Sequence, residues 1–482
     1  MLLFTLIIQT KDLIFIFVLN SVNPRFYPKY HLAPPSGWMN DPNGFCIFNG
    51  EYHLFYQYNP NSSQVPGIAH WGHVKSKDLF SWIHLPIAMS PDKEYDRGGV
   101  FSGSAIVENN TMYLFYTGNV NKEGQTPDHE QRQALAWSHD GVNVTKYDGN
   151  PIIEGAKRQP NIRDPKVWKH GDTYYMVLGN SYKNDSLGRV LLYSSKDKHH
   201  WKEISILDQS YGFLGYMWEC PDFFELNGYF ILLFSPQGIK SQGIRFNNLY
   251  QTGYLVGYFD YHNFKFTPVT EFRELDSGHD FYATQTIEDE MGERVMIAWA
   301  DMWEENYPER NDGFTGQMTI PRILTLDHQL RLMQKPVPQI QNAVGKKLHS
   351  GKVHGDNVVK LVDNVGKIDI KAPGRHDFTF IIEVNGKPAV TISYDYDAGL
   401  VTLDRGGEDG KRSTKWRPRD NLRWAVYVDS SSIEIFLGEG EATFTSRYFP
   451  DGDVSVRIPE HCQAAEMNVY EMKHTVPPPS DS

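Results

Sequence analysis

Cysteine is scarce in this sequence: among 482 residues there are three, Cys46, Cys220 and Cys462. A small odd number excludes a disulfide framework as the main source of stability, and no cysteine or histidine spacing indicates a zinc site. Basic residues are also few, because 47 lysines and arginines face 59 aspartates and glutamates. The net charge of −12 argues against nucleic acid or an anionic membrane as a partner, but not against a neutral small molecule. We therefore expect no metal and no cofactor.

A long apolar run is absent as well. The first 20 residues are apolar, but Lys11 and Asp12 divide them, and neither half reaches the roughly 20 residues of a membrane span. Lys11 followed by residues 13–19 fits the charged and apolar regions of a signal peptide. Secretion also fits four N-glycosylation sequons, at Asn61, Asn109, Asn143 and Asn184. We predict a leader over residues 1–24 and a secreted protein, with a cytoplasmic location as the alternative.

Helical periodicity is nearly absent, and a β pattern repeats in its place. A turn followed by a short aromatic and aliphatic run recurs five times, at intervals of 57 to 64 residues. The turn residues are Gly50, Asn110, Gly171, Gly228 and Gly292. Five units of this length, each with about four short strands, predict an all-β fold with a five-bladed β-propeller over residues 25–335. A sandwich of stacked hairpins would not explain the even spacing.

The segment ahead of each turn should form the innermost strand of its blade, which lines the central channel. In three units this segment holds a polar cluster with a carboxylate: WMNDPNGF (38–45), IRDPKVW (162–168) and WECPDFF (218–224). Each cluster alone has a structural explanation, as a surface turn, a capped turn with an ion pair, or a buried hydrogen bond. Their matched positions instead predict one site where Asp41, Asp164 and Glu219 converge.

Carboxylates without metal ligands suit glycosidic bond cleavage, which needs an acid for the leaving oxygen and a carboxylate for the cation-like carbon. Glu219 stands between Trp218 and Cys220, so apolar surroundings should keep it protonated as a general acid. Asp41, in a turn rich in backbone N–H groups, should stay ionised as a nucleophile. Asp164 should stay ionised beside Arg163 and bind hydroxyl groups. The segment 70–73, with two histidines, is interpreted as packing and channel lining rather than as a metal site.

Six motifs, in this order and spacing, resemble glycoside hydrolase family 32, the family of invertases, inulinases, levanases and sucrose-6-phosphate hydrolases. They are WMNDPNG (38–44), YQYNP (56–60), WGH (71–73), FSGS (101–104), RDP (163–165) and ECPD (219–222). The resemblance extends from about Tyr30 through nearly the whole remaining chain. It implies a propeller followed by a β-sandwich, and hydrolysis of terminal β-D-fructofuranosyl residues, of sucrose or short fructans, with retention at the anomeric carbon.

The resemblance also implies residue roles. Asp41 would be the nucleophile that forms a fructosyl-enzyme, Glu219 the acid/base and Asp164 the stabiliser of the transition state, with about 5–5.5 Å between the carboxyls of Asp41 and Glu219. Cys220 would modulate the acid/base rather than form a disulfide. The fructosyl unit would be bound by Asn40, Gln57, Ser102 and Arg163, in a pocket whose aromatic residues are Trp71, Phe101, Tyr282 and Trp299.

One position departs from the family: Val65, followed by Pro66, stands where many members carry a tryptophan, so the leaving-group side should be reshaped. From 345 to 475, alternating polar and apolar runs predict an antiparallel β-sandwich, which we interpret as a stabilising domain rather than a sugar-binding module. Three other functions stay open: a fructosyltransferase with the same residues, a sucrose-6-phosphate hydrolase, and an inactive sugar-binding propeller. The last is disfavoured because all three carboxylates are present.

Overall fold

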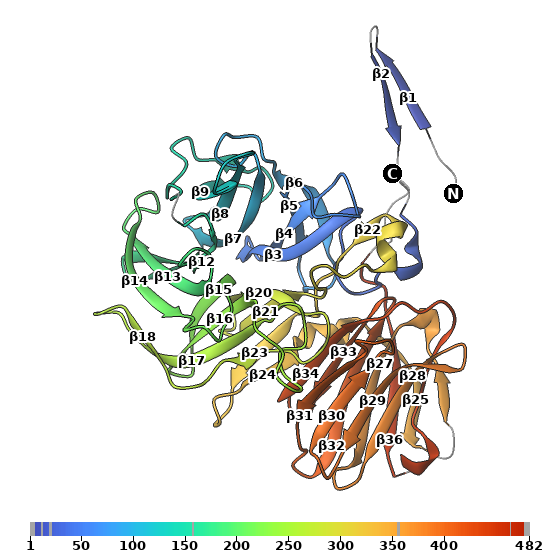
Figure 1. Ribbon diagram of the computed structural model, residues 1–482. Coiled ribbons are helices and arrows are strands. Elements are labelled where there is room, and N and C mark those ends of the chain that lie inside the picture. Colours follow the sequence, from blue (N-terminus) through green and yellow to red (C-terminus); the bar gives the residue numbers. More distant parts are fainter. Residues whose placement is uncertain are drawn as a thin grey trace.

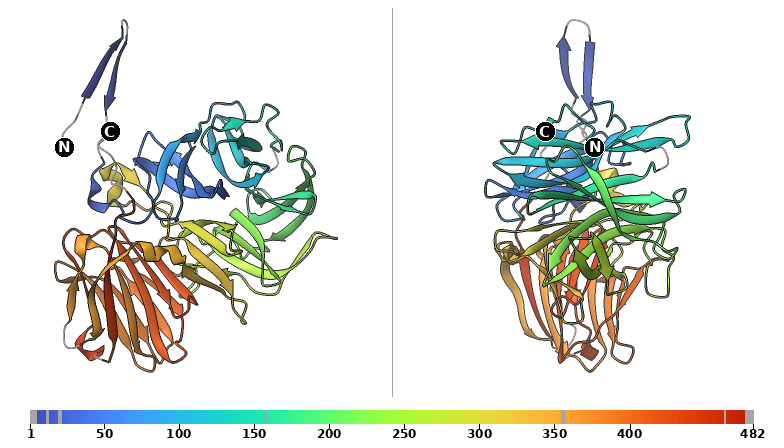
Figure 2. Two further views of the ribbon diagram at one scale, coloured as in Figure 1. Left: turned by 180° about the vertical axis from the view of Figure 1, so that it is seen from behind. Right: turned by 90° about the vertical axis from the view of Figure 1, so that its left-hand side faces the viewer.

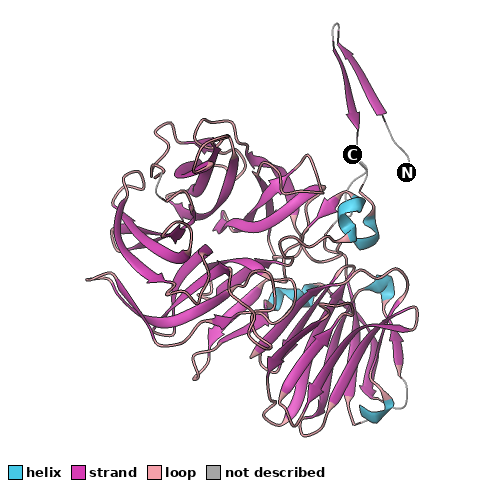
Figure 3. Cartoon of the chain, in the orientation of Figure 1, coloured by secondary structure: helices cyan, strands magenta, loops and turns pink. Residues whose placement is uncertain are grey.

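The computed structural model describes residues 5–10, 13–18, 22–156, 159–353, 357–462 and 464–476, and its regular structure is nearly all β (Figures 1 and 3). Five sheets form a ring over Gly37–Pro336, and two six-stranded sheets follow over Val344–Met472. The predicted five-bladed propeller with a C-terminal sandwich is confirmed. The helical elements of the described residues are short 3-10 turns: η1 (Pro24–Phe26), η2 (Pro308–Asp312), η3 (Pro338–Asn342), η4 (Val362–Asn364) and η5 (Glu460–Cys462).

The blades follow one another in chain order, each as an antiparallel meander from the channel outward. The first two are β3 (Gly37–Phe48), β4 (Glu51–Asn59), β5 (His70–Ser76) and β6 (Ile83–Met89), then β7 (Gly99–Glu108), β8 (Thr111–Asn121), β9 (His129–Ser138) and β10 (Thr145–Lys146). The third is β11 (Ile162–His170), β12 (Thr173–Tyr182), β13 (Leu187–Ser195) and β14 (Lys202–Gln209). The last two are β15 (Met217–Leu226), β16 (Tyr229–Gln237), β17 (Gly253–Asp260) and β18 (Lys265–Pro268) with β19 (Arg273–Glu274), then β20 (Tyr282–Glu288), β21 (Arg294–Trp299), β23 (Arg322–Leu326) and β24 (Leu332–Pro336).

Every innermost strand carries a β-bulge at the same height. The ladder register shifts between Met39 and Pro42, Phe101 and Gly103, Arg163 and Lys166, Glu219 and Asp222, and Tyr282 and Gln285. In three blades a residue of the bulge has a positive φ, namely Asp164 at 65°, Cys220 at 48° and Ala283 at 56°. Bulges redirect side chains, and left-handed backbone at non-glycine residues concentrates at functional sites. The five bulges thus turn their side chains around one point of the channel.

A strand from the last blade closes the ring onto the first. β22 (Phe314–Thr315) lies in the connection between β21 and β23, yet it pairs in parallel with β3, with Phe314 opposite Gly37 and Thr315 opposite Trp38. Gly37 has a φ of 77°, and a Cβ there would lie 2.2 Å from the carbonyl oxygen of Asn59. A side chain at this position would therefore disturb the strand that carries Asp41.

The sandwich packs against the side of the ring formed by the first and last blades (Figure 2). Its sheets contain, in spatial order, β25 (Val344–Lys352), β36 (Glu466–Met472), β27 (Gly366–Pro373), β32 (Asn421–Asp429), β33 (Ser432–Leu437) and β34 (Ala442–Arg447), and β26 (Val358–Lys360), β35 (Val454–Arg457), β28 (Phe378–Val384), β29 (Lys387–Asp395), β30 (Leu400–Asp404) and β31 (Lys411–Lys415). Between the domains, Tyr427 and Phe436 join an apolar cluster with Ile320 and Val337.

The predicted leader falls partly outside the described residues, since 1–4, 11–12 and 19–21 are not described. Within it, β1 (Thr5–Thr10) and β2 (Leu13–Val18) form an antiparallel hairpin that projects from the body of the molecule (Figures 1 and 2). The four sequon asparagines are all exposed. In the part of the chain that the structure describes, no helix has the length and hydrophobicity needed to span a membrane.

Candidate active site

A cavity of about 870 Å³ opens over the bulges of the inner strands. Eight of the twelve predicted site residues line it: Asn40, Asp41, Gln57, Phe101, Ser102, Arg163, Asp164 and Glu219. Asp164 and Glu219 follow Asp41 by 123 and 178 residues in the sequence. All three carboxylates nevertheless share one cavity. The other four, Trp71, Cys220, Tyr282 and Trp299, are buried behind this surface.

Asp41 is held by side-chain donors. Ser102 Oγ donates to its Oδ2 at 3.0 Å, Asn40 Nδ2 donates to its Oδ1 at 3.0 Å, and the Cys220 thiol donates to Oδ2 at 3.4 Å. Burial and then the nearby charge of Glu219 raise the pKa of Asp41, while the three donors oppose that rise. The backbone N–H groups expected to keep Asp41 ionised are thus replaced by side-chain donors.

Asp164 occupies the bulge of the third blade with its carboxylate buried. The backbone N–H of Cys220 donates to its Oδ2 at 2.9 Å, and the Cys220 thiol lies 3.6 Å from the same oxygen. Burial and the charge of Glu219 raise the pKa of Asp164 well above its ordinary value, although Arg163 acts in the opposite direction. The expectation that Arg163 keeps Asp164 simply ionised is wrong, because this arginine pairs with a different carboxylate.

That carboxylate is Glu219. Arg163 donates from Nε at 2.9 Å and from Nη2 at 2.7 Å to Oε1. The Tyr282 hydroxyl donates to Oε2 at 2.5 Å, and Gln237 Nε2 donates to the same oxygen at 2.9 Å. Glu219 therefore lies among polar donors, and the predicted apolar surroundings are wrong. Trp218, which suggested them, is fully buried and stacks on Phe234 with 4.1 Å between ring centroids.

The physical reason is strand geometry. Successive side chains of a strand point to opposite faces, so Trp218 and Glu219 do not share an environment. Cys220, in the bulge, turns its thiol toward Asp41 and Asp164 instead of toward Glu219. All three cysteines are free and buried, in agreement with the expectation that Cys220 forms no disulfide.

The aromatic predictions need correction in three places. Trp71, Tyr282 and Trp299 are fully buried and do not line the cavity; Trp71 instead donates from Nε1 to the backbone carbonyl of Phe101 at 2.9 Å. Phe101 does line the cavity. Tyr282 acts on the site through its hydrogen bond to Glu219.

Sequence reasoning missed Trp303 and Gln237. Trp303 lines the cavity, and its ring packs on Trp38 at 6.3 Å and against Trp299 at 5.1 Å. Trp38 in turn donates from Nε1 to Asn40 at 3.0 Å. Neither missed residue belongs to a polar cluster ahead of a turn, so no signal in the sequence marked them.

The mouth of the cavity is acidic. Glu123 and Asp128 line it, and the basic side chains among its described lining residues are Arg163 and His129. Val65, at the position that departs from the family, is 53% exposed, and Pro66 forms part of the wall. Among the described residues, no group of three or more histidine, cysteine or acidic side chains is arranged to hold a metal ion.

A propeller whose channel gathers carboxylates around a sugar-sized cavity is the architecture of a glycoside hydrolase. Residues 31–336 match the glycosyl hydrolases family 32 N-terminal domain, and residues 332–470 match the family 32 C-terminal domain. The chain belongs to glycoside hydrolase family 32, and the resemblance read from its motifs is confirmed.

Relatives and solved structures of similar sequence agree with this family assignment. A raffinose invertase from Escherichia coli is 38% identical over 444 residues, 89% of this chain and 90% of the relative. A sucrose-6-phosphate hydrolase from Zymomonas mobilis is 38% identical over 460 residues, 90% of this chain and 88% of the relative. The structure of a family 32 β-fructofuranosidase from Bombyx mori in complex with sucrose has 41% identity and a TM-score of 0.89, covering 95% of this chain and 96% of that one. None of these comparisons supports the predicted leader or secretion, which stay predictions.

Proposed function

We propose that the protein is a retaining β-fructofuranosidase that hydrolyses sucrose. The observation that carries the proposal is the convergence of Asp41 and Glu219 on one cavity with different partners: Asp41 is held by neutral donors, and Glu219 by a guanidinium. Two carboxyl groups with distinct environments are what double displacement at an acetal needs. The Bombyx mori structure with sucrose supports the substrate class.

In the first step, an Asp41 oxygen attacks the anomeric carbon of the fructosyl unit, and the bond from that carbon to the glucosyl oxygen breaks. Glu219 gives its proton to this oxygen, so that glucose leaves neutral. In the second step, water attacks the anomeric carbon, the bond to Asp41 breaks, and Glu219 takes the proton from the water. Two displacements at one carbon give retention.

Asp164 serves a different task in this scheme. Its buried position next to Asp41, with the Cys220 thiol between the two carboxyl groups, suits a group that binds sugar hydroxyls and faces developing positive charge. Arg163 keeps Glu219 in place during both proton transfers, since its two N–H groups hold one carboxylate oxygen.

The acidic mouth favours sucrose over phosphorylated sucrose. Glu123 and Asp128 would repel a phosphate, and the described lining offers Arg163, already paired with Glu219, and His129. Hydrolysis of sucrose 6-phosphate is the second candidate, because several relatives are named sucrose-6-phosphate hydrolase. Such an enzyme would act in the cytoplasm, whereas the predicted leader favours secretion.

The test is fructose release from sucrose, sucrose 6-phosphate, raffinose and inulin at equal concentrations. We expect kcat/KM for sucrose to exceed that for sucrose 6-phosphate; the reverse order would replace the first candidate by the second.

Hydrolysis and fructosyl transfer would use the same residues, so the two activities are distinguished by their reaction products. At high sucrose concentration we expect free fructose and glucose in nearly equal amounts. A large excess of glucose, with fructosylated oligosaccharides, would identify a transferase.

A further inference from the structure

We propose that the sandwich positions the acid/base of the propeller: Arg405 holds Asp280, and Asp280 fixes the strand end from which Tyr282 donates to Glu219. The inference rests on the proposed role of Glu219. It assigns the C-terminal domain a part in the reaction, in place of stabilisation alone, and makes Arg405 and Asp280 positioning residues.

The chain that leads into the inner strand of the last blade is paired with the sandwich. Ser277 N–H donates to the carbonyl of Thr443 at 2.8 Å, and Asp280 N–H donates to the carbonyl of Thr445 at 3.0 Å. Both acceptors belong to β34, the edge strand of one sandwich sheet. Residues 277–280 thus run along the sandwich immediately before β20 begins at Tyr282.

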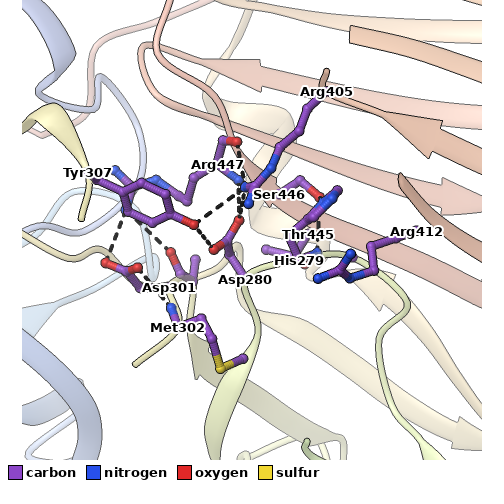
Figure 4. Close-up of polar contacts among 12 residues, drawn as sticks. His279, Asp280, Asp301, Met302, Tyr307, Arg405, Arg412, Thr445, Ser446 and Arg447 are labelled. Carbon is purple, nitrogen blue, oxygen red and sulfur yellow. Dashed lines mark hydrogen bonds and ion pairs between the residues drawn. The ribbon is translucent and has the colours of Figure 1, made fainter. Parts of the chain in front are cut away.

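The carboxylate of Asp280 fastens this segment (Figure 4). It is fully buried, and its Oδ2 accepts from Arg405 Nη1 at 2.7 Å and from the backbone N–H of Arg447 at 2.7 Å. The Tyr307 hydroxyl donates to Oδ1. Asp301, Glu305 and the guanidinium of Arg447 are further charged groups near Asp280. Arg405 is therefore the sandwich side chain whose cation neutralises Asp280 directly.

Tyr282 follows two residues after Asp280 and is fully buried. Its hydroxyl reaches Glu219 Oε2 at 2.5 Å, and the ladder register shifts directly after it. Fixing the strand end leaves the ring little freedom to withdraw from Glu219. The other donors to Glu219, Arg163 and Gln237, stand on the third and fourth blades, so the sandwich reaches the acid/base through Tyr282.

A double-mutant cycle tests this connection. We combine Arg405→Gln with Tyr282→Phe in the full chain and measure kcat, KM and the pH dependence of kcat on whichever sugar the wild type hydrolyses fastest. Charged groups that face Glu219 and shape this profile are Arg163, Asp41 and Asp164. Losing a donor to the carboxylate destabilises its ionised form, so each single variant should move the alkaline limb to higher pH, and kcat should fall about tenfold with KM little changed.

The decisive result is non-additivity. If Arg405 acts through Tyr282, Arg405→Gln lowers kcat in the wild-type background but changes neither kcat nor the alkaline limb in the Tyr282→Phe background. The inference is overturned if Arg405→Gln has the same effect in both backgrounds, or none in either. Failure of sucrose as the substrate is a separate result, because the cycle uses the best substrate found.

Arg457→Gln is the matched control. Arg457 is 22% exposed against 16% for Arg405, and it bonds Glu383 at 2.7 Å within the sandwich. It should leave kcat and the pH profile unchanged. If Arg405→Gln does not fold, Arg405→Lys, which keeps the charge but loses the planar fork, replaces it in the same cycle.

Discussion

Two buried charged clusters in this molecule are built on opposite principles. In the channel, Asp41, Asp164 and Glu219 share one guanidinium, that of Arg163, which pairs with Glu219. Between the domains, each carboxylate of the cluster pairs with a cation, and six carboxylates share four cations. The interdomain cluster contains Asp276, Asp280, Asp301, Glu309, Asp429 and Glu434 with His31, Arg322, Arg405 and Arg447.

The pKa directions express the difference. In the channel, burial and neighbouring negative charge raise the pKa of Asp41 and of Asp164. Between the domains, burial is outweighed at two carboxylates, because His31 lowers the pKa of Asp429, and Arg322 with His31 lowers that of Glu434. Asp301 is the exception, since burial and the charges of Glu309 and Asp280 raise its pKa although Arg447 opposes the rise. A charge imbalance that the fold tolerates in a cavity marks chemistry, whereas a satisfied network marks structure. We therefore assign the carboxylates that share one cation around the cavity to the reaction, and the paired carboxylates between the domains to structure.

The largest effect should come from Glu219→Ala, which we expect to lower kcat on sucrose by several orders of magnitude while the protein stays folded. We expect this because the proposed function assigns the channel carboxylates to the reaction and not to stability. Glu225→Ala, an exposed position on the same strand, is the control and should retain full activity. Activity near the wild-type level in Glu219→Ala would remove its assigned role.

Arg322→Met should instead lower the stability of the protein. Arg322 is fully buried between Asp276 at 3.2 Å and Glu434 at 2.6 Å, so its loss leaves two buried carboxylates short of a partner. We expect the free energy of unfolding in urea to fall by about 3–5 kcal/mol. Arg331→Met, which breaks a partly exposed pair with Asp327, should cost less than about 1 kcal/mol. Equal costs for both would contradict the structural role of the cluster.

Stability should fall above neutral pH through His31. Burial lowers the pKa of His31, but Asp429 and Glu434 raise it to about 9, above the unfolded value of 6.5. Its contribution is therefore complete below pH 6.5 and lost as the pH rises toward 9, by about 3 kcal/mol at most. Urea unfolding at a series of pH values measures this loss. His31→Gln should be less stable at pH 6 and lack this slope; an unchanged slope would contradict the assignment.

Ser102→Ala should act on the acid side of the rate profile. The Ser102 hydroxyl donates to Asp41 and lowers its pKa, so its removal should raise that pKa and move the acid limb of kcat/KM upward by about one pH unit. Ser104→Ala removes a hydroxyl two residues further along, which accepts from Val167 N–H, and should leave the limb in place. If only the Ser104→Ala control shifts the acid limb, the limb does not report the ionisation of Asp41.

The smallest expected effect is none: dialysis against a chelator should leave kcat on sucrose unchanged. The channel cluster holds its carboxylates with Arg163 and neutral donors, and this arrangement needs no metal for the proposed displacement. Loss of activity that returns on adding a divalent cation would show that the charge imbalance is filled by a metal.

The sequence predicts the propeller and the convergence of the carboxylates because both follow from repetition. Five turns at even spacing define the blades, and Asp41, Asp164 and Glu219 stand at one height of the repeat. Repeats are a signal that survives without any knowledge of contacts between distant residues.

The environments of those carboxylates are not predictable in the same way. Adjacent residues on a strand face opposite sides, so the apolar packing of Trp218 does not indicate the environment of Glu219. The partner of Glu219 is Arg163, which reaches it from the neighbouring blade. Trp303 lies in the connection after β21 and Gln237 at the end of β16, and neither belongs to a motif. The charge balance between the domains depends on partners such as His31 and Asp429, which are far apart in the chain.

The most direct test substitutes one aspartate in each cluster by asparagine and measures kcat on sucrose and the free energy of unfolding for both. Asp41 accepts from neutral side chains in the channel, whereas Asp429 accepts from His31 and from the backbone N–H groups of residues 29–31. We expect Asp41→Asn to lose turnover and keep or gain stability, and Asp429→Asn to lose stability and keep its turnover while folded. An Asp41→Asn variant that still hydrolyses sucrose at the wild-type rate would contradict the assignment of the channel cluster to the reaction.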